Sequence, residues 1–330
     1  MTDTTASPRE FAIDSRPLDV LILAGGLSHE REISVRSGRR VAEALISVGM
    51  SAHVRDIDPG LLGYLETARP DVVWPLLHGS TGEDGSVRDL LALAGVNYVG
   101  TDAPGSRIAW SKPVAKTLLR RSGAHTPAFA TLPQSLFRQA GARPVLDTVL
   151  RQLGLPLVVK PAKGGSALGV SMVTDAEDLP QAMVTCFSYG DTALIERAVS
   201  GTELALSVVD LGEGPVTLPA VEVVTQGAYD YDARYNPGRT RYFVPARLDP
   251  SQIAAAEELA LLAHRRLGLQ HLSRTDMILG EDGEAWFLEV NVAPGMTETS
   301  LLPQAAQASG LPLGEIYGEI ARQGASTIRH

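Results

Sequence analysis

Two short segments near the C-terminus, Arg274-Thr275-Asp276 and Glu289-Val290-Asn291, indicate how this chain folds and what it can bind. They lie in the apolar runs 272–279 and 285–292, and the turn-forming segment Gly280-Glu281-Asp282-Gly283 joins these runs, so the pattern predicts a β-hairpin. Side chains two residues apart share one face of a strand, so the hairpin would gather two carboxylates, a carboxamide oxygen and a guanidinium. Such oxygens suit Mg²⁺, and the guanidinium could stabilise a developing negative charge. A solvated polar face is the alternative interpretation.

Composition restricts the class of protein. A chain of 330 residues has room for two or three domains with separate cores. Its formal net charge of −9 argues against a general binder of nucleic acid or of anionic membranes. The single cysteine, Cys186, cannot form an intramolecular disulfide, and we expect it to be a buried apolar residue. The chain has no run long and apolar enough to span a bilayer and no apolar signal-peptide centre, so we predict a cytoplasmic protein.

The N-terminal third alternates strands and helices after a lead-in, residues 1–18, that we expect to be disordered. Strands are predicted at 19–24, 52–57, 72–76 and 98–100, and helices at about 29–48 and 86–94. This alternation predicts a parallel sheet with helices on both faces, whose ligands bind beyond the carboxyl ends of the strands. Gly25–Glu30 and His78–Gly85 both lie there. We expect Ser28 to cap the first helix, with Glu30 and Glu32 in its first turn.

The rest of the chain predicts two further units. The predicted elements are a helix at 112–121 and strands at 157–161 and 170–173, then strands at 203–210 and 216–224 and a helix at 250–267. Asp249 followed by Pro250 suits the start of that last helix as its N-cap and first position.

Other polar segments carry possible chemistry. Lys160 is followed by a glycine-rich loop that reaches Gly169, which could bring N–H groups and a positive charge to a phosphate, although a mobile hairpin turn explains this segment better when it is taken alone. The backbone beside Glu196 could bind an adenine edge and Glu203 a ribose, or Glu196 could form a surface ion pair. His78 could orient a carboxylate or move a proton, or simply stabilise a capped turn.

The loop 229–235 alternates tyrosines with charged residues. This composition suits a lid that excludes water from a bound ligand.

Taken together, these motifs resemble the D-alanine–D-alanine ligases of the ATP-grasp superfamily. The resemblance extends from about Asp19 to Leu302. It rests on Gly25-Gly26-Leu27-Ser28-His29-Glu30-Arg31-Glu32-Ile33-Ser34, on His78–Gly85, on Arg274–Asp276 and on Glu289–Ser300 with Pro294-Gly295-Met296-Thr297. It implies an α/β ATP-grasp fold of three α/β domains. These would be an N-terminal Rossmann-like domain with a parallel sheet at 19–105, a central ATP-grasp subdomain at 106–196, and a C-terminal ATP-grasp subdomain with the metal and catalytic site at 197–330.

The resemblance also implies the residues that bind ATP and metal. Lys112 and Lys160 would hold the nucleotide phosphates, with Ser166 and Arg234 also at the ATP site. The remaining implied contacts are Glu196 and Val199 at the adenine, Glu203 at the ribose, and Asp276, Glu289 and Asn291 as ligands of two Mg²⁺ ions, for which Mn²⁺ could substitute.

For the substrates, the resemblance implies that Glu30 binds the ammonium of the first D-alanine, with His78 nearby. Ser300 and the Gly295 backbone would hold the second D-alanine, and Arg274 with Gly295 would stabilise the oxyanion. Ser166 and Tyr235 would join Glu30 in tying the lids together.

The implied function is the ATP-dependent joining of two D-alanines through a D-alanyl phosphate, with release of ADP and phosphate, for peptidoglycan precursor synthesis. Such an enzyme is an ATP-dependent carboxylate–amine ligase, and we expect a homodimer. Two alternatives remain open. One is a related ligase that takes D-lactate or another D-amino acid second, and the other is a catalytically silent binding or regulatory homologue.

Overall fold

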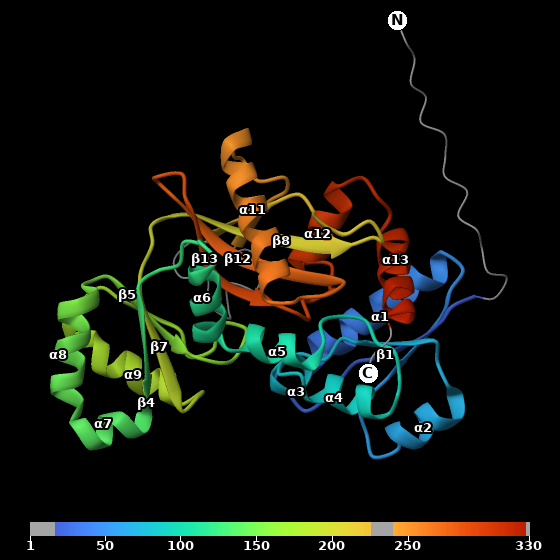
Figure 1. The fold of residues 1–330 in the computed structure, drawn as a ribbon, viewed down its shortest axis with the longest axis horizontal. Coiled ribbons are helices and arrows are strands. Elements are labelled where there is room, and N and C mark those ends of the chain that lie inside the picture. The colour runs from blue at the N-terminus through green and yellow to red at the C-terminus, as the bar shows by residue number, and fades with distance from the viewer. Residues whose placement is uncertain (1–16, 226–239, 328–330) are drawn as a thin grey trace, which may run out of the picture.

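The computed structural model describes residues 17–225 and 240–327, and the strands in these ranges form three sheets (Figure 1). The N-terminal sheet is parallel, with strand order β2-β1-β3, as the alternation of strands and helices predicts. Its strands are β1 (Asp19–Leu23), β2 (Ser51–Arg55) and β3 (Val72–Pro75). The helices around it are α1 (Arg31–Ser47), α2 (Leu61–Ala68), α3 (Ser80–Glu83), α4 (Ser86–Leu93) and α5 (Ala103–Trp110).

The end of the chain closes the core of this first sheet. Helix α13 (Leu313–Ser326) lies beside α1 in Figure 1 and also contacts β3. The rings of Trp74 and Tyr317 pack edge to face with their centroids 5.8 Å apart, and both side chains are buried. The N-terminal unit is therefore held together by residues from both ends of the chain.

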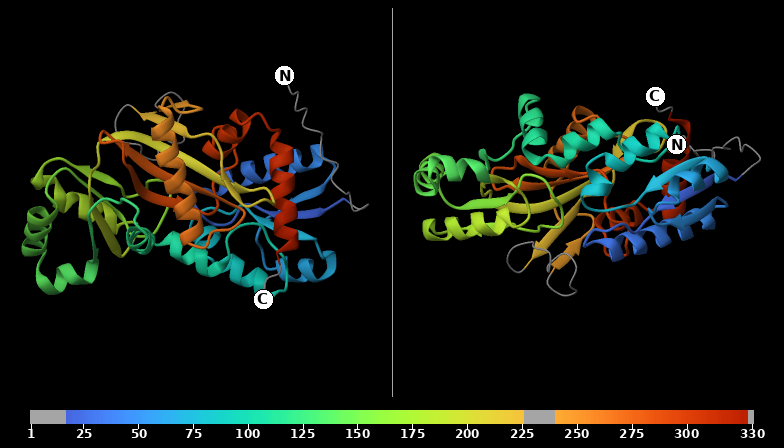
Figure 2. Two further views of the ribbon diagram at one scale, coloured as in Figure 1. Left: turned by 45° about the horizontal axis from the view of Figure 1, so that its top comes forward. Right: turned by 90° about the horizontal axis from the view of Figure 1, so that it is seen from below.

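The central sheet is antiparallel, with strand order β4-β7-β5-β6. Its strands are β4 (Phe129–Pro133), β5 (Leu157–Pro161), β6 (Ser171–Val173) and β7 (Thr192–Arg197), and its helices are α7 (Gln134–Ala140), α8 (Ala142–Leu153) and α9 (Leu179–Phe187). Figure 2 shows this unit at one end of an elongated molecule in both views. Cys186 is buried in its core, as expected, and burial raises the pKa of the thiol to about 12.

The C-terminal sheet has the order β11-β10-β8-β12-β13, with β9 paired to β8. Its strands are β8 (Gly201–Asp210), β9 (Pro215–Thr217), β10 (Val221–Thr225), β11 (Thr240–Phe243), β12 (Leu272–Gly280) and β13 (Ala285–Asn291). Helices α6 (Lys112–Arg121) and α11 (Pro250–Arg266) pack on it, and α12 (Leu301–Ala308) contacts β8 and β10. Asp249 forms the predicted cap of α11, with a full capping box.

The predicted hairpin is confirmed as β12 and β13, which pair antiparallel. Arg274 lies opposite Asn291 and Asp276 opposite Glu289, and the register shifts directly after Asp276. Residues opposite one another across two strands bring their side chains close together. The four polar groups of the hairpin therefore share one face, as the sequence predicts.

Three local predictions are wrong. The run 216–224 forms two strands, β9 and β10, because Pro219 between them has no N–H to donate to a sheet. The segment 98–100 makes only an isolated bridge, between Tyr98 and Val73. Ser28 does not cap α1: its hydroxyl accepts from the Glu30 N–H in the turn before the helix, and Glu30 is the N-cap residue, outside the first turn.

In the parts of the chain that the structure describes, no helix is long and apolar enough to cross a membrane. The expected lead-in falls mostly on residues 1–16, outside the described residues. The division into domains at 105/106 and 196/197 stays a prediction.

Candidate active site

A cleft opens between the central sheet and the C-terminal hairpin. The cleft lies where Lys160 of β5 and Glu196 of β7 face Asp276 and Glu289. Its apolar wall includes Val158, Val170 and Met172, and its other walls include Lys112, Lys160, Gly165, Glu196, Val199, Glu203, Asp276 and Glu289. Among the described residues, all those that the sequence predicts for the nucleotide and metal therefore line this cleft, except Ser166 and Asn291.

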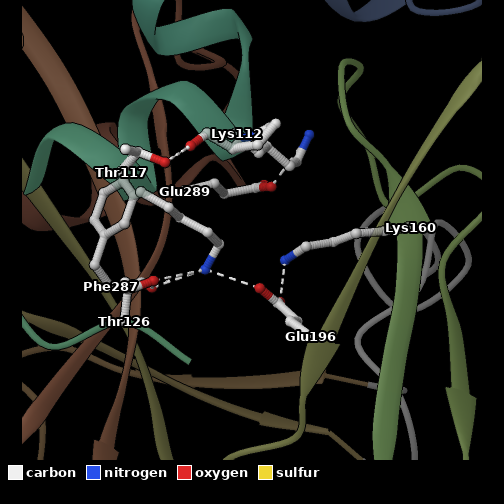
Figure 3. Close-up of polar contacts among 9 residues, drawn as sticks. Lys112, Thr117, Thr126, Lys160, Glu196, Phe287 and Glu289 are labelled. Carbon is white, nitrogen blue, oxygen red and sulfur yellow. Dashed lines mark hydrogen bonds and ion pairs between the residues drawn. The ribbon is translucent and has the colours of Figure 1, made fainter. Parts of the chain in front are cut away.

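Several charged groups of the cleft are paired with one another, and Figure 3 shows Lys112 beside Glu289 and Lys160 beside Glu196. Lys160 forms an ion pair with Glu196 Oε1, and the buried Lys116 lies 2.8 Å from Glu196 Oε2. Glu196 is 2% exposed, so its carboxylate is not part of a surface ion pair. Burial acts to raise the pKa of Glu196, but the two lysines outweigh it and hold the pKa below its usual value.

Lys112, the first residue of α6, faces the hairpin. Its Nζ lies 3.4 Å from Glu289 Oε2, and it also donates to the carbonyl oxygen of Gly164 in the glycine-rich loop. Helix α6 thus brings one lysine to the loop and to the hairpin at once.

Arg274 and Asp276 form a two-point ion pair along β12. Arg274 Nε and Nη2 donate to Asp276 Oδ1 and Oδ2 at 2.7 and 2.8 Å. On β13, the carboxamide oxygen of Asn291 accepts from the Ala293 N–H at 2.8 Å. Each acceptor oxygen keeps a second lone pair for another partner.

A second pocket lies beside the first, between the N-terminal sheet and the hairpin. It brings together residues that are far apart in the sequence: Glu30, His78, Glu83, Gly165, Ser166, Tyr242, Arg274, Asn291, Gly295, Thr297 and Ser300 all line it. Gly165 lines both pockets, and a small cavity between them is lined by Lys112, Ser166, Arg274, Glu289 and Asn291. Every described residue that the sequence predicts for the substrates lies here.

The loop residue Ser166 reaches across to the N-terminal unit. Its hydroxyl donates to Glu30 Oε1, and both Ser166 and Ala167 have left-handed backbone angles, φ 53° and 56°. Residues other than glycine rarely adopt this conformation without a constraint from their surroundings. The predicted contact between Ser166 and Glu30 is therefore present.

His78 and Glu83 are buried next to Glu30. Burial lowers the pKa of His78, although Glu30 and the Ala293 backbone act in the opposite direction, so the imidazole is neutral near pH 7. Within the described residues, nothing hydrogen-bonds to its Nε2. Burial and the charge of Glu30 raise the pKa of Glu83 to about 7, although Glu83 accepts from the Gly79 N–H at 2.9 Å.

Gly295 and Ser300 form the far wall of the second pocket. A Cβ at position 295 would lie 2.7 Å from Ser300 Oγ, so any larger residue here would displace the Ser300 hydroxyl. Ser300 Oγ accepts from the Thr297 N–H at 3.0 Å, and the Met296 N–H donates to Ser37 of α1 at 3.0 Å. These contacts fix the segment that follows the hairpin against the N-terminal unit.

Comparison with known proteins places this geometry in a family. A family model described as the D-ala D-ala ligase C-terminus matches residues 118–321. The D-alanine–D-alanine ligase of Bordetella petrii is 36% identical over 330 residues, covering 99% of this chain and 98% of that protein. That of Gloeobacter violaceus is 39% identical over 91% of this chain and 97% of its own length. The chain belongs to the D-alanine–D-alanine ligase family.

A solved structure agrees with the fold of this family member. The D-alanine–D-alanine ligase of Bacillus anthracis in complex with ATP has a TM-score of 0.78 and 28% sequence identity, over 94% of this chain and 97% of that one. The predicted α/β ATP-grasp fold, with a parallel N-terminal sheet, is confirmed.

The donor set on the hairpin of this family member fits a magnesium site. Asp276 and Glu289 supply carboxylates and Asn291 an amide oxygen, and Asp276 lies opposite Glu289 across the two strands. No group of three or more histidines, cysteines or acids suited to a metal occurs among the described residues. Two carboxylates and an amide oxygen match Mg²⁺, which proteins bind through one or two carboxylates together with phosphate oxygens and water.

Some residues of the site were missed or cannot be described. Lys116 and Glu83 were not predicted as site residues, although Lys116 follows Lys112 by four residues and so shares its helix face. Tyr242 and Thr297 of the second pocket were also missed, and neither carries a signal by itself. Arg234, Tyr235 and the predicted lid lie outside the described residues.

Proposed function

We propose that this family member joins two D-alanines to D-alanyl-D-alanine at the expense of ATP, for peptidoglycan precursor synthesis. One observation carries the proposal: a lysine-lined cleft and a pocket lined by the acids Glu30 and Glu83 adjoin at Gly165 and at the Arg274–Asn291 face of the hairpin. The first suits a polyanionic nucleotide and the second suits amino acids with an ammonium group. Their shared wall would place a phosphoryl donor next to a carboxylate.

In the cleft, we assign the phosphates of ATP to Lys112 and Lys160 and to the N–H groups of the loop that includes Ser166. The base would lie on the apolar wall beside Glu196 and Val199, and the ribose beside Glu203. Lysine ammonium groups and loop N–H groups are the usual partners of phosphate oxygens.

Asp276, Glu289 and Asn291 would hold two Mg²⁺ ions, or Mn²⁺ in their place, which would offset charge on the transferring phosphoryl group. In this chain, Arg274 orients Asp276 and Lys112 lies against Glu289, so both carboxylates are positioned in advance. This orientation reduces the reorganisation needed when ligands bind.

In the second pocket, Glu30 would bind the ammonium of the first D-alanine, and the neutral His78 could accept a hydrogen bond through Nε2. The carboxylate of this D-alanine attacks the γ-phosphorus of ATP, which gives a D-alanyl phosphate and ADP.

The second D-alanine would lie at Ser300 and the Gly295 backbone. Its deprotonated amine attacks the acyl carbon, and phosphate leaves as the peptide bond forms. Arg274 and the Gly295 N–H would stabilise the tetrahedral oxyanion. Closure through Ser166, Glu30 and the predicted Tyr235 contact would keep water from the acyl phosphate.

The test is to measure ADP release with D-alanine, D-serine, D-lactate and other D-amino acids, and to identify the products by mass spectrometry. D-Alanyl-D-alanine as the main product would support the proposal. An ester or mixed product would favour the related ligase, and no turnover with Mg²⁺ and ATP would favour a silent homologue.

The homodimer, the cytoplasmic location and the domain boundaries stay predictions.

A further inference from the structure

Lys116 is a fully buried lysine to which the proposed reaction gives no role. Its Nζ lies 2.8 Å from Glu196 Oε2, and it donates to Thr126 Oγ1 at 3.0 Å and to the carbonyl oxygen of Phe287 at 3.1 Å. An ammonium has three N–H donors, and here it has three oxygen partners, which belong to Glu196, Thr126 and Phe287, all labelled in Figure 3. A buried charge is tolerated when it is paired and hydrogen-bonded in this way.

The charges of this cluster do not cancel. Glu196 is bound by Lys116 on one oxygen and by Lys160 on the other, so two ammonium groups share one carboxylate and leave one positive charge. Lys160 and Glu196 line the nucleotide cleft, while Lys116 is buried behind them. Without Lys116, the carboxylate of Glu196 would neutralise Lys160 by itself.

Both partners keep their charge near neutral pH. Burial lowers the pKa of Lys116 to about 8, against the opposing effect of Glu196, so the ammonium form still predominates at pH 7. Glu196 stays ionised because the two lysines outweigh the effect of its burial.

Lys116 also has a structural role that must be separated from its charge. Its bond to Phe287 joins α6 to β13, and Lys112 joins the same helix to Glu289, two residues further along the strand. Loss of this contact could shift the helix. A change in nucleotide binding alone would therefore not distinguish the two roles.

We propose that Lys116 is a positioning residue that neutralises Glu196, so that the charge of Lys160 stays available to the phosphates of the nucleotide. The inference rests on the proposed binding of ATP in this cleft. It predicts that the need for Lys116 disappears once Glu196 carries no charge.

The test compares Lys116→Met, Glu196→Gln, the double variant and the control Arg121→Met, which removes an exposed positive charge from the end of the same helix. The dissociation constant of the non-hydrolysable analogue AMP-PNP with Mg²⁺ is measured by calorimetry without D-alanine, and the KM for D-alanine is measured separately. We expect Lys116→Met to weaken analogue binding by about tenfold or more, since a charged contact is lost. The double variant should return to within about threefold of wild type.

Several results would overturn the inference: analogue binding by Lys116→Met equal to wild type, a double variant as weak as Lys116→Met, or an equal loss in Arg121→Met. Should Lys116→Met fail to fold, the comparison of Glu196→Gln with the double variant decides. If Glu196→Gln and the double variant have equal dissociation constants, the inference is supported, because a buried lysine without its carboxylate loses its proton and its charge. If the double variant binds the analogue a further tenfold more weakly than Glu196→Gln, the inference is contradicted. A wild type that binds the analogue without joining D-alanine would contradict the proposed reaction alone.

Discussion

The nucleotide cleft and the substrate pocket share one hairpin but balance their charges in opposite ways. In the cleft, three carboxylates lie beside cations: Glu196 beside two lysines, Glu289 beside Lys112 and Asp276 beside Arg274. In the pocket, the carboxylate of Glu30 lies close enough to Glu83 to raise its pKa. The cleft therefore holds carboxylates paired with an excess of cations, and the pocket holds crowded negative charge.

This difference indicates which charge each proposed ligand would bring to its pocket. A polyanion entering the cleft can take over the lysines, while metal ions take over the carboxylates that it displaces. An ammonium entering the pocket relieves the repulsion between two carboxylates. In both places the proposed substrates would complete a charge balance that the protein alone leaves unfinished.

The largest effect should follow from a change in the cleft. Glu289→Gln keeps the size of the side chain but removes a charge from the proposed two-metal site and from Lys112. Turnover should fall by about a thousandfold or more, because such a site supplies several kcal/mol of transition-state stabilisation. Steady-state kinetics at moderate Mg²⁺ would measure the loss, and the melting temperature should change little.

The matched control is Glu281→Gln, an exposed acid in the turn of the same hairpin. It should keep wild-type turnover. Near-normal turnover of Glu289→Gln would remove Glu289 from the metal assignment and would leave the cleft with one carboxylate ligand, Asp276.

A smaller and different effect is expected in the pocket. Glu30→Gln removes the charge proposed to bind the ammonium of the first D-alanine, while the amide can still accept from Ser166. The KM for this D-alanine should rise about ten- to hundredfold, the loss expected for one hydrogen bond between charged groups. The KM for ATP should stay close to that of wild type.

Glu32→Gln is the control for this change, since Glu32 is an exposed acid in the first turn of α1. A Glu30 variant that only melts earlier and still binds D-alanine normally would assign Glu30 a purely structural role. It would also show that the negative charge of the pocket serves something other than the substrate.

Different parts of the fold and of the site also differ in how far the sequence could predict them. The hairpin was predictable because its alternation and its Gly/Asp turn are local, and the spacing of Arg274, Asp276, Glu289 and Asn291 alone puts them on one face. The division of 216–224 into two strands could also have been predicted, since Pro219 interrupts the segment. The apolar character of the run nevertheless led to the prediction of one strand.

The partners of buried charges were not predictable in this way. Nothing local marks Lys116 as the partner of Glu196, because their contact depends on how α6 packs against two different sheets. Glu83 was visible as an acid in a turn, yet its raised pKa comes from burial and from Glu30, a residue distant in sequence. Motifs predicted the groups that we propose to touch ligands, and only the fold showed the groups that set their charge.

The last and smallest expected effect concerns stability. It reports how strongly burial and the charge of Glu30 raise the pKa of Glu83 in the pocket. The pKa of Glu83 is about 7 in the folded protein and near 4.5 without these surroundings. Between these values the folded state holds a proton that the unfolded state has released, so stability falls as pH rises from about 4.5 to 7.

Glu83→Gln removes the group whose titration lowers the stability above pH 4.5, and it keeps an oxygen that can accept from the Gly79 N–H. At pH 8 the variant should be more stable than wild type by about 1 to 3 kcal/mol, a rise of a few degrees in melting temperature. At pH 5 the gain should mostly vanish, because Glu83 is then protonated in the folded wild type. Calorimetric melts of both proteins at the two pH values test this. A gain of equal size at both would show that Glu83 does not titrate in this range, and that the pocket is less crowded with charge than its geometry indicates.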